Sequence, residues 1–101
     1  MTLQVDESRN AANIQIEGEI AIESIGGIVQ DVSAITDKYA TLVFNIRNVA
    51  KIDLAGIQFF YAVQKKMKNN GKKITFDFEL EQKDKDLIET TGFSELLNSK
   101  I

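Results

Sequence analysis

The 101-residue chain contains no cysteine and no histidine. It therefore has no thiol or imidazole nucleophile, and the common zinc and haem ligand sets are missing. Without cysteine it forms no disulfide, which favours a cytoplasmic location. The sequence also has no Gly-rich phosphate-binding loop and no pair of carboxylates at a catalytic spacing. We therefore expect no catalytic residues, no metal site and no cofactor.

Long hydrophobic runs and an excess of basic residues are absent as well. No apolar run approaches the roughly 20 residues that cross a membrane, and the first ten residues lack the basic and apolar parts of a signal peptide. The net charge is −3 and the pI about 4.9, whereas the phosphate backbone of nucleic acids requires a basic surface. We therefore expect neither membrane insertion nor nucleic-acid binding, and we interpret the lysines of residues 65–73 as a solvated helix end.

The composition is that of an ordinary globular protein, with 44% hydrophobic and 27% charged residues. The length predicts a single domain over residues 1–101 with one core. Alternating apolar residues predict strands at 2–7, 13–19 and 73–78, the first two forming an antiparallel hairpin. The apolar run at 41–45 predicts a central strand that is buried on both faces.

Helices are predicted between the later strands. Ser24 is a good N-cap for a first helix, because the apolar residues that follow it, Ile25, Ile28, Val29, Val32 and Ile35, share one helical face. A second helix is predicted over 57–70, a third from Asp84 or Lys85 to just before Gly92, and a last helical turn over 94–97. The order β-β-α-β-α-β-α predicts an α/β fold with a small mixed sheet and helices mainly on one side.

Three segments, in this order, resemble the STAS family of anti-sigma factor antagonist domains. They are GEIAIES at 18–24, LVFNIRNVAKIDLAGIQFF at 42–60, and NNGKKITF at 69–76 followed by LIETTGFSELL at 87–97. The resemblance covers nearly the whole chain. It implies a STAS-like fold and a non-catalytic, bacterial protein-interaction module. The implied partner is an anti-sigma-type kinase or another signalling protein, in a pathway such as stress or chemotaxis.

The loop from Asp53 through Leu54, Ala55 and Gly56 to Ile57 joins a strand to a helix. The start of a helix presents unpaired backbone N–H groups, which suits docking. The resemblance implies that this loop is the partner-binding surface, together with the nearby Ser24 and Tyr61. Phospho-regulated members of the family carry serine or threonine directly before the glycine, and the phosphate charge breaks their interface. This chain has Ala55 there, so no phosphorylation is expected at that position.

Several alternatives remain open at this stage. Asp53 caps the following helix, contacts the partner, or does both. Leu54 either contacts the partner or folds inward, and Phe59 or Tyr61 is expected to be partly exposed. An alternative function is an accessory subunit of an ABC-type lipid transporter ATPase, which would depend on Tyr61 and Gln64. A third is a homo-oligomer that pairs through an open sheet edge, although we expect a monomer or a weak homodimer.

Overall fold

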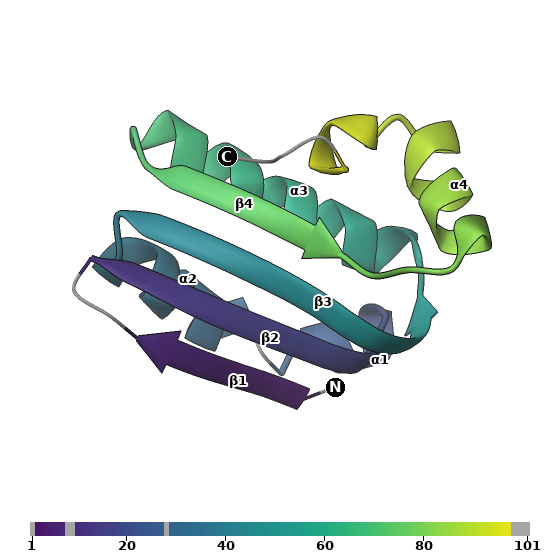
Figure 1. Ribbon diagram of the computed structural model, residues 1–101, viewed down its shortest axis with the longest axis horizontal. Coiled ribbons are helices and arrows are strands. Elements are labelled where there is room, and N and C mark those ends of the chain that lie inside the picture. The colour runs from purple at the N-terminus through teal and green to yellow at the C-terminus, as the bar shows by residue number, and fades with distance from the viewer. Residues whose placement is uncertain (1, 8–9, 28, 98–101) are drawn as a thin grey trace.

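The computed structural model describes residues 2–7, 10–27 and 29–97. Its elements run in the order β1-β2-α1-α2-β3-α3-β4-α4-η1, where η1 is a short 3-10 helix (Figure 1). The strands are Thr2–Glu7 (β1), Ala11–Ile20 (β2), Thr41–Ile52 (β3) and Lys73–Phe78 (β4). The helices are Ile22–Ile25 (α1), Val29–Lys38 (α2), Leu54–Asn69 (α3), Gln82–Thr90 (α4) and Ser94–Leu96 (η1).

The four strands form one mixed sheet in the order β1-β2-β3-β4. The β1–β2 pair is antiparallel, and the pairs β2–β3 and β3–β4 are parallel. The predicted hairpin and the predicted mixed sheet are therefore confirmed. Each parallel connection contains a helix, as a parallel crossover requires.

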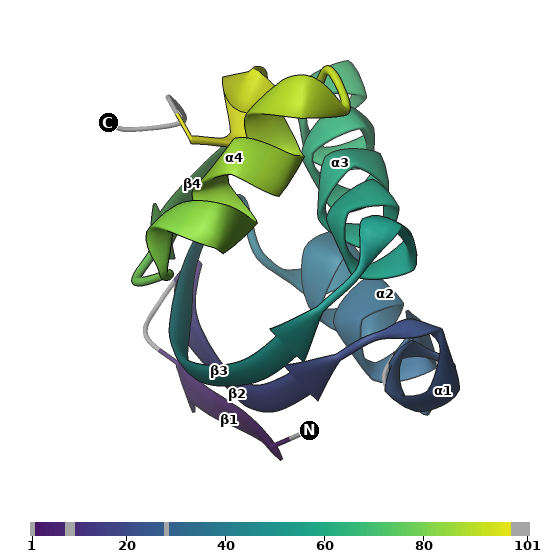
Figure 2. The same cartoon turned by 90° about the vertical axis from the view of Figure 1, so that its right-hand side faces the viewer.

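The helices α1, α2 and α3 lie on one face of the curved sheet (Figure 2). On β3 the residues Leu42, Phe44 and Ile46 point to that face and are buried. Their neighbours Val43 and Asn45 point to the other face and are only half-buried. The helices thus pack on one side as predicted. The expectation that this strand is buried on both faces is wrong, because no helix of the described residues covers the second face (Figure 2).

The core joins α3 to the sheet through aromatic rings. The Phe44 and Phe76 rings stack with centroids 5.3 Å apart, and Phe60 of α3 meets Phe76 edge-on at 5.7 Å. Ile57 and Met67 of α3 are fully buried on the same side. Each fully buried side chain of this size contributes about 1.5–3 kcal/mol to stability, so the core fixes α3 firmly on the sheet.

Strand β3 is longer than predicted, since it has 12 residues and reaches Ile52. Its second half follows a shift in register opposite Gly18. There Gly18 has φ 93° and Asn48 has φ 50°, a left-handed conformation that glycine and asparagine adopt most readily. The bulge and the polar residues Arg47 and Lys51 conceal the strand pattern in the sequence.

The predicted N-cap role of Ser24 is wrong. The N-cap of α1 is Ala21, and Ser24 lies three residues later, inside the helix. The Ser24 Oγ atom accepts a hydrogen bond from the Ala21 N–H (3.3 Å) and donates to the Glu19 carbonyl (2.7 Å). The single predicted helix is in fact two, because Gly26 and Gly27 form a turn after α1 and α2 begins at Val29. Ile28 lies outside the described residues.

The other predicted helices are present, but their first and last residues differ slightly from the predictions. Helix α3 begins at Leu54 rather than Ile57, and α4 begins at Gln82 rather than Asp84. Gly92 follows α4 with φ 89°, and η1 forms the predicted last turn. The early start of α3 places the whole loop from Leu54 to Ile57 in its first turn.

Candidate functional site

The carboxylate of Asp53 connects α1 to α3. Its Oδ1 atom accepts a hydrogen bond from the Gly56 N–H (3.0 Å), and Oδ2 accepts one from the Ile22 N–H (3.3 Å). The predicted capping of α3 is therefore confirmed, and the same side chain also holds the start of α1. The Gly56 N–H is the main cause that lowers the pKa of Asp53; partial burial opposes the shift, and the Ile22 N–H and the charge of Lys51 add to it.

Gly56 is required at this junction because the backbone of β2 passes very close to it. A Cβ atom added at Gly56 would lie 2.4 Å from the carbonyl oxygen of Ile20 and 2.9 Å from its Cγ2 atom. The Asp53 N–H also donates to the Ile20 carbonyl at 3.3 Å. The first turn of α3 is therefore packed directly against the end of β2, which places α1 beside it.

Two large apolar side chains remain exposed at this junction. Ile22 of α1 is 69% exposed and Leu54 of α3 is 43% exposed. Leu54 therefore does not fold inward, which was one of the two alternatives, and its side chain is available for contact with a partner. Ala55 is half-buried, while Gly56 and Ile57 are buried. Among the residues predicted from the loop, Leu54 and Ala55 are thus accessible, whereas Gly56 and Ile57 position the helix.

The predicted contact residue Tyr61 lies further along α3. It follows Leu54 by seven residues, which places it on the same face of the helix about 10 Å away along the axis. Its ring packs on Phe93 with centroids 5.1 Å apart, and both Tyr61 and Phe59 are half-buried. The expectation that one of these two aromatic residues is partly exposed is confirmed. Sequence reasoning did not single out Ile22, although it lies within the segment 18–24 that carries the resemblance.

Several lysines of α3 and its C-terminal turn hold neighbouring elements in place. The Lys66 ammonium lies 3.1 Å from Asp37 Oδ1, and Lys68 lies 2.6 Å from Glu95 Oε1. The Lys72 ammonium donates to the backbone carbonyls of Thr36 and Asp37 at the end of α2. These contacts give the lysines a structural role.

Within residues 2–7, 10–27 and 29–97 no group of three acidic, histidine or cysteine side chains is arranged to hold a metal ion. In the same part of the chain no helix is long and apolar enough to span a membrane.

The family model of the STAS domain matches residues 2–101. The chain therefore belongs to the STAS family, as the three sequence segments suggested. No curated protein matches the sequence.

Solved structures of anti-sigma factor antagonists share the fold. The Bacillus cell fate determinant SpoIIAA in its phosphorylated form superimposes with a TM-score of 0.72 at 12% identity, covering 94% of this chain and 87% of that chain. SpoIIAA in its unphosphorylated form gives 0.69 at 14% identity, with 84% and 80% covered. An anti-sigma factor antagonist from Mycobacterium paratuberculosis gives 0.71 at 20% identity, with 93% and 80% covered. At these identities the likeness establishes the fold.

Proposed function

We propose that this STAS domain is a single-domain, non-catalytic protein-interaction module that binds a regulatory kinase or another signalling protein. Its docking site is the α1–α3 surface, which we define as Ile22, Asp53, Leu54 and Ala55. The observation that supports the proposal is the exposure of Ile22 and Leu54 on either side of Asp53. Large apolar side chains that are exposed on two neighbouring elements are candidates for contact with a partner.

The α1–α3 surface is held rigid before any partner arrives. Asp53 accepts backbone hydrogen bonds from both helices, and Gly56 lets α3 pack against the Ile20 carbonyl. A rigid surface loses little conformational entropy on binding, which favours affinity. The surface therefore suits a partner that recognises a fixed shape.

The first turn of α3 carries no hydroxyl group, since its residues are Leu54, Ala55, Gly56 and Ile57. SpoIIAA, by contrast, has been solved in both phosphorylated and unphosphorylated forms. The nearest hydroxyl in α1, that of Ser24, is already bonded to backbone groups of Glu19 and Ala21. We therefore propose that binding by this chain is constitutive and that any regulation lies in the partner.

The test is a pull-down from native cell extract with the wild type and Ala55→Glu side by side, read by mass spectrometry. Glutamate is tolerated near the start of a helix, so the variant should fold, but its charge lies within the α1–α3 surface. We expect the wild type to capture a kinase-type or other soluble signalling protein and Ala55→Glu to lose it. The matched control is Ala34→Glu, the same change at an exposed position of α2, which should capture the partner normally.

Capture of a signalling protein equally well by Ala55→Glu would exclude the α1–α3 surface. Capture of a transporter ATPase instead would support the alternative function in membrane transport. The burial of Gln64 argues against that alternative, because the transporter subunit would use Gln64 as a contact residue and its side chain is only 1% exposed. Self-association with no partner in any lane would point to the homo-oligomer.

A further inference from the structure

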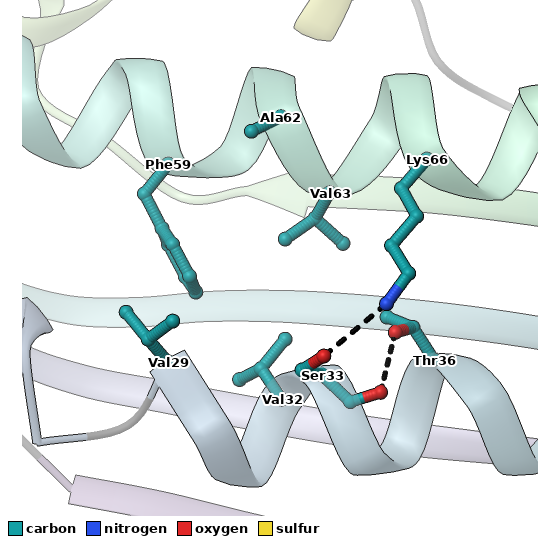
Figure 3. Close-up of a pocket in the computed structure, with 8 residues that line it drawn as sticks. All are labelled: Val29, Val32, Ser33, Thr36, Phe59, Ala62, Val63 and Lys66. Atoms are coloured by element: carbon teal, nitrogen blue, oxygen red, sulfur yellow. Dashed lines mark hydrogen bonds between the residues drawn. The ribbon is translucent and has the colours of Figure 1, made fainter.

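A groove between α2 and α3 lies apart from the α1–α3 surface. Its volume is about 180 Å³. Figure 3 shows Val29 and Val32 of α2 facing Phe59 and Val63 of α3 across it. Val32 and Val63 are buried at the base, whereas Val29 is 43% exposed at the mouth. The groove is therefore an apolar slot that is open at its mouth to water.

Lys66 lines one end of the groove and is a cation. Its ammonium donates to Ser33 Oγ (3.2 Å) and lies 3.1 Å from Asp37 Oδ1 (Figure 3 shows the Ser33 contact). An ammonium has three N–H donors, and these two contacts use two of them. The Asp37 side chain is 68% exposed, so its pairing with Lys66 is weak and exchangeable in water.

Two other side chains that line the groove, Ser33 and Thr36, already make hydrogen bonds. Ser33 Oγ accepts from Lys66, and Thr36 Oγ1 donates to the Ser33 carbonyl at 2.7 Å. Among the described residues, the buried side-chain atoms without a hydrogen-bond partner belong to Gln64 and Thr75, neither of which lines the groove. A ligand therefore meets mainly apolar walls, with Lys66 and the Ser33 hydroxyl at one end.

We propose that this groove binds a small amphiphilic carboxylate with an apolar chain of about six to eight carbon atoms. The size follows from the volume, because an apolar cavity of about 150 Å³ accommodates benzene. The charge follows from Lys66, since a carboxylate accepts the third N–H of its ammonium and competes there with the exposed carboxylate of Asp37. The chain of the ligand covers Val29, Phe59 and Val63.

Sodium octanoate, kept below its micelle concentration, is the probe, and 1-octanol is its uncharged counterpart. We expect saturable chemical-shift changes of backbone amides in α2 and α3 during an NMR titration of the isotope-labelled protein. Lys66→Gln should weaken octanoate binding about fivefold and change octanol binding less than twofold, because only octanoate loses a charge-assisted hydrogen bond. Comparing both ligands in both proteins isolates the contribution of the charge.

Three further variants make the test specific. Lys65→Gln, at an exposed neighbouring position, should bind octanoate as the wild type does. Asp37→Asn should bind it about two- to threefold more tightly, because the competing carboxylate is removed. Ala62→Phe, a change at an exposed position beside the groove, should abolish binding of both ligands, with circular dichroism confirming that the protein still folds.

Shifts that do not saturate, or that spread over the sheet, would overturn the proposal. So would equal effects of Lys66→Gln and Lys65→Gln. If octanoate does not bind and Ala62→Phe instead releases a protein captured by the wild type, the groove belongs to the protein partner and the proposal is wrong. The proposal does not depend on the α1–α3 surface, so either can fail alone.

Discussion

Helix α3 makes two very different contacts with its helical neighbours. At its N-terminus it packs on the end of β2, because Gly56 lets it approach the Ile20 backbone, and Asp53 ties it to α1 by accepting hydrogen bonds from both helices. Along its middle it faces α2 across a groove of about 180 Å³. There the helices are joined by long lysine side chains from α3 and the turn after it. One helix thus combines a rigid junction with a loosely filled interface, and the groove in this interface leaves room for a small ligand.

The strongest way to break the rigid junction is Gly56→Ala. The new Cβ would lie 2.4 Å from a backbone oxygen that cannot turn away, so we expect a loss of about 3 kcal/mol in the free energy of unfolding. Urea denaturation followed by circular dichroism measures this. Gly26→Ala is the control, since Gly26 has helical φ and ψ and no atom within 4 Å of the added Cβ. It should stabilise the protein by about 0.4–1 kcal/mol, and a loss as large as that of Gly56→Ala would refute the close-approach argument.

Substitution of Asp53 should cause the second largest loss of stability at the same junction. Asp53→Ala removes the cap of α3 and the acceptor for the Ile22 N–H, so we expect a loss of about 1–2 kcal/mol at pH 7 in the same denaturation experiment. Asp53→Asn is the matched variant, because asparagine still caps a helix but carries no charge. It should lose less stability than Asp53→Ala.

The charge of Asp53 also predicts a pH dependence. Its pKa in the folded protein lies below the ordinary value of 3.8, so its charge stabilises the fold fully above that value. This contribution is lost as the pH falls through the lowered folded-state pKa. The stability difference between the wild type and Asp53→Asn should therefore be constant from pH 7 to pH 5 and shrink below pH 4. A difference that persists unchanged at pH 2 would contradict the assignment.

Substitutions in the loosely filled interface between α2 and α3 should change the stability of the protein least. Lys72→Met removes the bonds from the ammonium to the Thr36 and Asp37 carbonyls at the end of α2, where a cation also favours the helix dipole. We expect a loss of about 0.5–1 kcal/mol in low salt that diminishes at about 1 M salt, because exposed charges are then screened. Lys73→Met, at the exposed neighbouring position, should have no measurable effect. Equal losses of stability for both variants would show that the hydrogen bonds of Lys72 make no specific contribution.

The sequence predicted the elements better than their boundaries. The mixed sheet and the helices on one side follow from the order of the elements and the spacing of apolar residues. The early start of α3 could have been predicted, because Asp53 was already a candidate cap. The length of β3 could not, since a bulge at Gly18 and polar residues such as Arg47 interrupt the pattern.

The site was predicted in part. The sequence singled out the loop from Asp53 to Ile57. Which of its residues are exposed and which are buried depends on how α3 packs on the sheet, which the sequence pattern did not show. The role predicted for Ser24 was wrong because the one-turn helix Ile22–Ile25 begins earlier and includes Ser24 itself. The groove was not predicted at all, since its existence depends on the separation of α2 and α3, which no local pattern of residues encodes.

The strand order of the sheet follows the order of the chain, so every strand pairs with its neighbour in sequence. The polypeptide can therefore assemble the sheet progressively along the chain, since each strand pairs with the one before it. The chain also contains no proline, so the prolyl isomerisation that delays many proteins by tens of seconds does not arise. A newly made molecule thus reaches its binding-ready shape without the help of a prolyl isomerase.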